Sequence, residues 1–195
     1  SGPFDFVSSG APLLAATAVD AFGEVCINTI FPPVGSFVLT GSDLTAGDIV
    51  VGPLDGFAFY DANAFDYVPT LTLTHDGTLS FEVSVRFLPT AAVAYAGDIP
   101  VAGGGANTSI AVSGTGVDTP PVAVTGAASN IGLNNAQLTG TLASAGCTDP
   151  SVVGIEYSTV DGFAPGSGTS INAPTVGDSW TVDAELLAPC ATYYF

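Results

Sequence analysis

The feature that most limits the fold of this 195-residue chain is a series of short runs in which apolar and polar residues alternate. Residues 81–87, Phe-Glu-Val-Ser-Val-Arg-Phe, place an apolar side chain at every odd position, which is the period of a β-strand with one buried face. An Asp-Gly pair at residues 76–77 predicts a hairpin turn before that run. Similar runs recur at a spacing typical of β-sandwiches, at residues 36–40, 48–51, 71–74, 108–113, 136–142, 152–158 and 179–184. The 24 glycines and 14 prolines fit tight turns between short strands, so the chain is predicted to be all-β.

A proline pair divides the chain. Residues 117–121, Val-Asp-Thr-Pro-Pro, predict a short extended linker, because consecutive prolines cannot continue a central strand. We therefore expect two tandem β-sandwich domains, at residues 13–118 and 119–195, preceded by an N-terminal arm at residues 1–12. Six strands are expected in the second domain, one fewer than a seven-strand sandwich needs.

The charge of the chain excludes several kinds of partner. It carries 18 Asp and Glu against a single cation, Arg86, and its formal net charge is −17. Such a charge repels nucleic acid and anionic lipid surfaces. No apolar run approaches the roughly 18 residues of a membrane span, so membrane insertion is not expected. A surface built from hydroxyl-bearing residues together with three cysteines favours an extracellular, secreted protein.

The sequence offers little for catalysis, and we expect no enzyme. His75 is the only histidine, and no nucleophile elbow, phosphate-binding glycine loop or zinc-protease motif is present. Asp55, Asp61 and Asp66 could suggest Ca²⁺, but their spacing does not match a calcium loop, so turn-forming aspartates are the preferred interpretation. No metal site and no cofactor are expected. Arg86 is expected to pair with an acidic neighbour on the outer face of its sheet.

The cysteines and one asparagine are candidates for covalent modification. Cys147 and Cys190 flank the strands of the second domain, and we predict a disulfide between them. Two interpretations of Cys26 then stay open, a buried thiol or a bond to a neighbouring subunit. Asn107 begins an Asn-Thr-Ser triplet after a glycine-rich turn and is a candidate glycosylation site, so glycans are possible attached groups.

Two sets of motifs carry a resemblance to known modules. In the first half of the chain they are residues 22–29, 85–90, 95–99 and 113–117. In the second half they are residues 154–158, 161–163, 166–169 and 187–194. With these motifs the first half resembles an immunoglobulin-like domain common in large secreted surface proteins of the Bacteroidetes, and the second half is similar to the fibronectin type III-like modules that alternate with it. These motifs consist mostly of turn glycines and core aromatics, so the resemblance implies a fold and a setting rather than an activity.

The two ends of the sequence suggest how such modules could associate. Residues 190–195 read as the front half of a buried strand, whereas residues 3–9 read as a lone alternating strand. In the fibronectin type III-like modules that the second half resembles, a last strand and a linker follow the Thr-Tyr-Tyr motif. Residues 6–14 look like that strand and linker, displaced to the front of the chain. The second domain is thus expected to lack its last strand.

The leading hypothesis is an extracellular structural protein, the subunit of a surface filament built from identical copies. Phe4, Phe6 and Val7 would form a donor strand, and Tyr193, Tyr194 and Phe195 would border the acceptor groove of the next subunit. A window of a long tandem array is an open alternative to separate subunits. The main rival is an adhesin or carbohydrate-binding module of a large cell-surface protein, in which Tyr60, Phe65 and Tyr67 would stack on sugar. An accessory domain of a secreted hydrolase is a third possibility.

Overall fold

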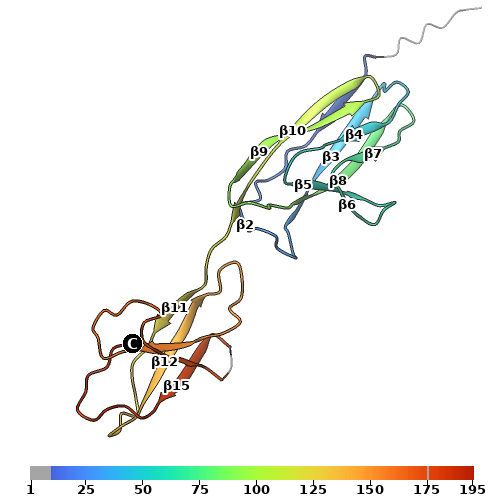
Figure 1. Cartoon of the computed structure of the whole chain (residues 1–195). Coiled ribbons are helices and arrows are strands. Elements are labelled where there is room, and N and C mark those ends of the chain that lie inside the picture. The colour runs from blue at the N-terminus through green and yellow to red at the C-terminus, as the bar shows by residue number, and fades with distance from the viewer. Residues whose placement is uncertain (1–9, 175) are drawn as a thin grey trace, which may run out of the picture. The chain divides into compact units, whose positions relative to one another are not determined.

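The computed structural model describes residues 10–174 and 176–195. The chain divides into two compact units, Ser1–Asp118 (unit 1) and Thr119–Phe195 (unit 2) (Figure 1). Every regular element among the described residues is a β-strand, which confirms the all-β prediction. The predicted donor residues Phe4, Phe6 and Val7 lie outside the described residues.

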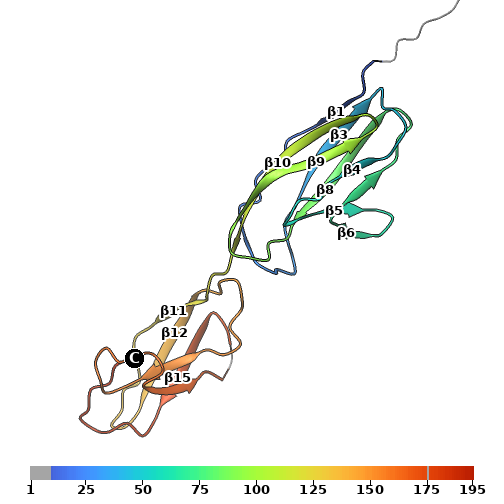
Figure 2. The ribbon, with the colours of Figure 1, turned by 45° about the horizontal axis from the view of Figure 1, so that its top comes forward.

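Unit 1 contains two five-stranded sheets, whose order along each sheet differs from the order in the chain (Figure 2). The first sheet runs in the order β1 (Leu13–Ala16), β3 (Val34–Ser42), β8 (Leu79–Phe87), β5 (Phe57–Asp61) and β6 (Asp66–Val68). The second runs in the order β2 (Glu24–Cys26), β10 (Ala106–Val117), β9 (Ala94–Gly103), β4 (Ile49–Val51) and β7 (Leu71–Leu73). All neighbours are antiparallel except β2 and β10, which are parallel.

The core of unit 1 contains the alternate side chains that the sequence pattern selects. Val83, Val85 and Phe87 of β8 are fully buried, whereas Ser84 and Arg86 between them are only partly buried. Phe87 stacks on Phe57 at a ring-centroid distance of 5.1 Å and also contacts the rings of Phe22 and Tyr95, at 5.7 and 5.3 Å. This aromatic cluster joins residues from distant parts of the chain, so it is a major source of the unit's stability.

The predicted hairpin at Asp76-Gly77 is wrong. The strand before it, β7, pairs with β4 in the second sheet, whereas the strand after it, β8, pairs with β3 and β5 in the first sheet. The turn is therefore a crossover between sheets. His75 fixes this crossover, because its Nε2 lies 2.6 Å from the carbonyl oxygen of Gly47 and its Nδ1 accepts a hydrogen bond from the Gly77 amide. Hydrogen bonds from the Thr78 hydroxyl and amide hold the pKa of the Asp76 carboxyl below its usual value.

Arg86 does not form the expected ion pair with an acidic residue of the described chain. Its guanidinium carbon lies 3.8 Å from the centroid of the Tyr67 ring, a cation–π geometry, and its buried Nε has no hydrogen-bonding partner. The strand register explains this arrangement, since β5 lies between β8 and β6 and presents the small Ala58 opposite Arg86. The side chain can therefore extend across β5 to the aromatic face.

Unit 2 contains a three-stranded and a two-stranded sheet. The first has the order β11 (Val122–Thr125), β12 (Ala136–Ser144) and β15 (Ser179–Ala184), and the second pairs β13 (Gly154–Tyr157) with β14 (Thr169–Asn172). Trp180 of β15 connects the two sheets, because its indole N–H donates a 3.2 Å hydrogen bond to the carbonyl oxygen of Gly154. Leu138, Ile155 and Val182 pack around it in a small apolar core.

The cysteine pairing predicted for unit 2 is wrong. Cys190 is free and exposed, whereas Cys26 and Cys147 are both disulfide-bonded, so Cys26 is not a free thiol either. Local structure places the two unit 2 cysteines apart. The Cys147 amide donates to the carbonyl oxygen of Thr119, at the start of the unit, and its sulfur lies 3.4 Å from the Thr119 amide and hydroxyl. Cys190 instead follows the last strand, in a positive-φ turn.

The free thiol of Cys190 gives a direct test of this pairing. We expect the folded chain to react with one equivalent of a maleimide before reduction and with three after reduction under denaturing conditions. Peptide mapping should place the first adduct on Cys190. Recovery of an unmodified, disulfide-linked Cys190 peptide would contradict the assignment.

Candidate functional site

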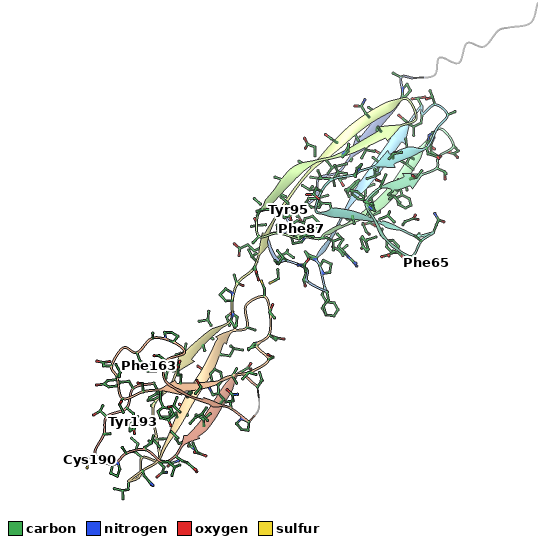
Figure 3. The ribbon with its side chains drawn as sticks, in the orientation of Figure 1. Phe65, Phe87, Tyr95, Phe163, Cys190 and Tyr193 are labelled. Carbon is green, nitrogen blue, oxygen red and sulfur yellow. The ribbon has the colours of Figure 1, made fainter. Side chains whose placement is uncertain are left out.

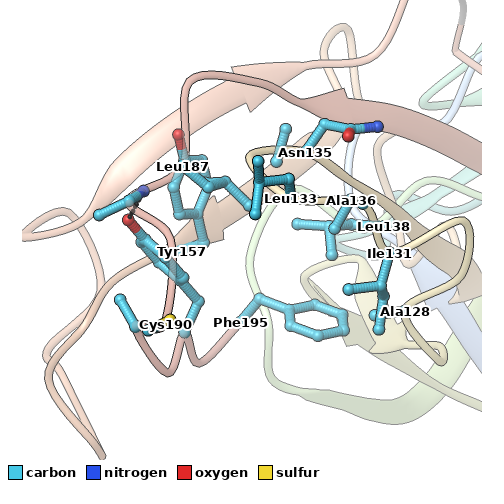
Figure 4. A pocket seen from close by; sticks show the side chains of 15 residues that line it. Ala128, Ile131, Leu133, Asn135, Ala136, Leu138, Tyr157, Leu187, Cys190 and Phe195 are labelled. Carbon is cyan, nitrogen blue, oxygen red and sulfur yellow. Dashed lines mark hydrogen bonds between the residues drawn. The ribbon is translucent and has the colours of Figure 1, made fainter.

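An apolar groove in unit 2 is the candidate functional site (Figure 4). Its volume is about 340 Å³. Three segments line it: the chain from Ala128 to Asn135, the first half of β12, and the segment that follows β15. The side chains used below are Ile131, Leu133, Leu138, Leu187, Tyr193 and Phe195. None of the residues lining the groove is charged, although the chain as a whole carries 18 acidic residues.

Backbone hydrogen bonds fix two of these segments against each other. The Gly132 amide donates to the carbonyl oxygen of Asn135 at 2.8 Å, which closes the turn before β12. The Leu187 amide donates at the same distance to the carbonyl oxygen of Asn134. The turn and the segment after β15 therefore form one wall of the groove. Leu138 and Leu187 pack at the core, beneath that wall.

Tyr193 fixes the last segment of the chain through its hydroxyl group. The Tyr193 hydroxyl accepts a 2.9 Å hydrogen bond from the amide of Ala188, five residues earlier, and the ring packs edge-on against Tyr157. This hydrogen bond holds residues 193–195 against the segment that follows β15. Unit 1 repeats the device, because the Tyr95 hydroxyl accepts hydrogen bonds from the amides of Thr90 and Ala91, both at 3.1 Å.

Within the described chain, residues 193–195 are bonded to unit 2 along one backbone edge only. Tyr194 exchanges two backbone hydrogen bonds with Ser158, an isolated antiparallel bridge, so residues 191–195 form less of a strand than expected. The amides of Tyr193 and Phe195 point away from Ser158, since backbone groups alternate along a strand. Within residues 10–174 and 176–195 these two amides have no hydrogen-bonding partner. An extended segment could pair with this edge.

Large apolar side chains are exposed beside that edge. Ile131 is 74% exposed and Leu133 is 80% exposed, and both line the groove. Phe195 is half-buried and packs against the core of the unit on one side of the groove (Figure 4). Exposed leucines and isoleucines are common singly, but here they cluster around a groove beside an open sheet edge, which is typical of an interaction site.

Two of the three predicted acceptor residues line the groove. Tyr193 and Phe195 line the groove, whereas Tyr194 does not. All three border a neighbouring hollow together with Phe163. Sequence reasoning missed Ile131, Leu133 and Leu187, which complete the lining. A usable signal was present, because two large apolar residues interrupt an Asn- and Gly-rich turn at residues 129–135.

The aromatic residues considered for sugar binding lie on or beside the β5–β6 hairpin of unit 1. Tyr60 and Tyr67 pack at a centroid distance of 5.4 Å, and Arg86 covers one face of Tyr67. Phe65, at the hairpin turn, is 83% exposed with a positive φ of 54° (Figure 3). The structure thus gathers these rings near one hairpin, although Arg86 occupies a face that a sugar would need.

The remaining predicted positions are exposed or partly exposed. Asp61 and Asp66 accept backbone hydrogen bonds from Asn63 and Tyr67 in the β5–β6 turn, and no cluster of three or more metal-ligating side chains is found among the described residues. Asn107 lies exposed on β10, opposite Ala102. Its side chain is therefore accessible to modification.

No protein-family model and no curated protein sequence matches the chain. Within the part of the chain that the structure describes, no helix is long and apolar enough to cross a membrane.

Proposed function

We propose that the chain is a structural subunit of an extracellular filament, assembled head to tail by β-strand donation between identical copies. The observation that carries the proposal is the open edge at Tyr193 and Phe195 beside an uncharged, apolar groove. An added strand would satisfy the backbone groups of this edge and cover the exposed Ile131 and Leu133. It would also remove an edge that favours aggregation.

Residues 3–7 are a suitable donor strand because apolar and polar side chains alternate at positions 4 to 6. Phe4 and Phe6 share one face of an extended chain, and Asp5 falls on the other. Two phenylalanines on one face would bury a large apolar area in an acceptor groove. The segment also contains few of the charges that would oppose such burial.

The geometry of unit 1 favours a second copy as the acceptor. Pro12 lies against Gly105, at the β9–β10 hairpin, so residues 1–9 are attached at that end of the unit. The chain leaves for unit 2 from the opposite end of β10, after Val117, and twelve strand residues span about 37 Å. Nine residues reach at most roughly 32 Å when fully extended. We therefore take the groove of a second copy as the acceptor.

The fold supports the finer assignment of the two units as immunoglobulin-like and fibronectin type III-like. Each unit has a tyrosine whose hydroxyl accepts backbone hydrogen bonds from residues four or five positions earlier, Tyr95 and Tyr193. This assignment agrees with the resemblance to secreted surface proteins of the Bacteroidetes, and a filament subunit needs no catalytic group.

An adhesin or carbohydrate-binding module is the second candidate. The observation in its favour is the aromatic group of Tyr60, Phe65 and Tyr67 on β5 and β6. Aromatic rings can stack on sugars, and Phe65 is exposed enough to do so. Regular fibres without added ligand are expected from the filament proposal alone.

Electron microscopy of the purified chain tests the filament proposal. The full chain should form regular fibres, and the double variant Phe4→Ser/Phe6→Ser should stay monomeric by light scattering, because it loses the apolar face of the donor. Asp5→Ser is the matched control on the opposite face and should still assemble. Absence of fibres from the full chain, or normal fibres from the double variant, would refute strand donation by this segment.

A further inference from the structure

On the basis of the proposed function, we infer where and how the donor strand binds. The geometry points to a strand of a second copy that pairs with the open edge at Tyr193 and Phe195 and inserts Phe4 and Phe6 between that edge and the turn carrying Ile131 and Leu133. The site is thus a specific acceptor for an apolar, alternating segment.

The side chains of the open edge determine which face of a donor strand can enter the groove. Tyr193 and Phe195, two residues apart, both line the groove, and Phe195 also packs against the core of unit 2, whereas Tyr194 between them is exposed. A neighbouring strand has the same period, so its residues i and i+2 lie on the same face as Tyr193 and Phe195. Phe4 and Phe6 meet this requirement, and Asp5 then faces solvent.

The absence of charge in the groove determines what kind of segment it can bind. The groove is lined without a charged residue, whereas the whole chain has a net charge of −17. A charged segment would lose its hydration there without gaining an ion pair. An apolar face is the expected occupant, and binding should depend only weakly on ionic strength.

Two exposed residues of the groove, Leu133 and Cys190, would be covered by a bound strand. Leu133 is 80% exposed and lines the groove, so a bound strand would bury it. Leu186 is 91% exposed but is not among the lining residues. Cys190 is a free, exposed thiol that does line the groove. A bound strand should therefore shield the Cys190 sulfur from a reagent in solution.

A peptide-protection experiment tests the inference on the full-length Phe4→Ser/Phe6→Ser chain, whose own donor face is removed. The probe is a synthetic peptide of residues 1–10, and the readout is the rate of maleimide addition to Cys190. A saturating amount of this peptide should slow the reaction at least about fivefold. A peptide with serine at positions 4 and 6 should have no effect, and one with serine at position 5 should protect.

Substitutions in the chain separate the groove from its surroundings. Leu133→Ser removes a leucine that the peptide would bury, which should raise the Kd of the peptide about tenfold or more. Leu186→Ser is the matched control and should leave the Kd unchanged. Both side chains are exposed, so neither change should unfold unit 2, and Trp180 fluorescence checks this directly.

The outcomes distinguish this site from the filament proposal as a whole. Lack of Cys190 protection by the peptide, or equal Kd values for the Leu133 and Leu186 variants, would overturn the groove assignment. Filaments that still require Phe4 and Phe6 would then leave strand donation standing at another edge. Conversely, peptide binding that depends on Leu133, in a chain that never forms fibres, would support the groove and refute the filament.

Discussion

Replacing Phe87 by alanine should lower the free energy of unfolding of unit 1 by about 3–5 kcal/mol. Phe87 is completely buried, and its ring lies at centroid distances of 5.1 to 5.7 Å from those of Phe22, Phe57 and Tyr95. Deleting it removes the ring that joins the other three and leaves a cavity that the sheets cannot close. The loss is a large part of the roughly 5–15 kcal/mol that keeps a domain folded.

The two units can be followed separately in such an experiment. Trp180 is the only tryptophan and lies in unit 2, so its fluorescence reports that unit, whereas circular dichroism reports both. In guanidinium chloride, Phe87→Ala should shift the dichroism transition and leave the fluorescence transition in place. Phe81→Ala is the matched control, because Phe81 lies on the same strand but is 39% exposed. Equal losses for the two variants would contradict the central role of Phe87.

The sequence predicted strands well where alternation is continuous. Residues 79–87 form β8 as expected, because every second residue is apolar and no turn residue interrupts the run. Strand β9 was missed, since Gly97 and Pro100 lie within it and both residues are uncommon in strands. Its place is set instead by ten paired residues along β10, a long-range interaction that local pattern does not report.

Long-range pairing also explains the other errors. An Asp-Gly turn can close a hairpin or begin a crossover, and the choice at Asp76 depends on β7 pairing with the distant β4. Cysteine connectivity likewise cannot be deduced from spacing alone, and Cys190 is free. The groove combines both difficulties, because Ile131 and Leu133 lie in a turn and meet Leu187 only after folding.

Gly140→Val should destabilise unit 2 by roughly 3 kcal/mol, the cost of overpacking a filled core. Gly140 lies directly opposite Trp180 in the ladder between β12 and β15, and the indole covers it. A Cβ atom on Gly140 would lie 2.5 to 2.7 Å from three atoms of the indole ring, including Nε1. The ring would have to move, and the hydrogen bond from Nε1 to the carbonyl oxygen of Gly154 would be lost with it.

The same substitution at Gly177 is the matched control, because a Cβ there would meet nothing closer than 3.9 Å. Trp180 fluorescence measures both effects: Gly140→Val should red-shift the emission and lower the denaturation midpoint, and Gly177→Val should change neither. Since the indole holds the two sheets of unit 2 together, loosening it should also weaken binding of the donor peptide to the groove of that unit. A Gly140 variant with native fluorescence and native stability would show that the core of unit 2 adapts without using this contact.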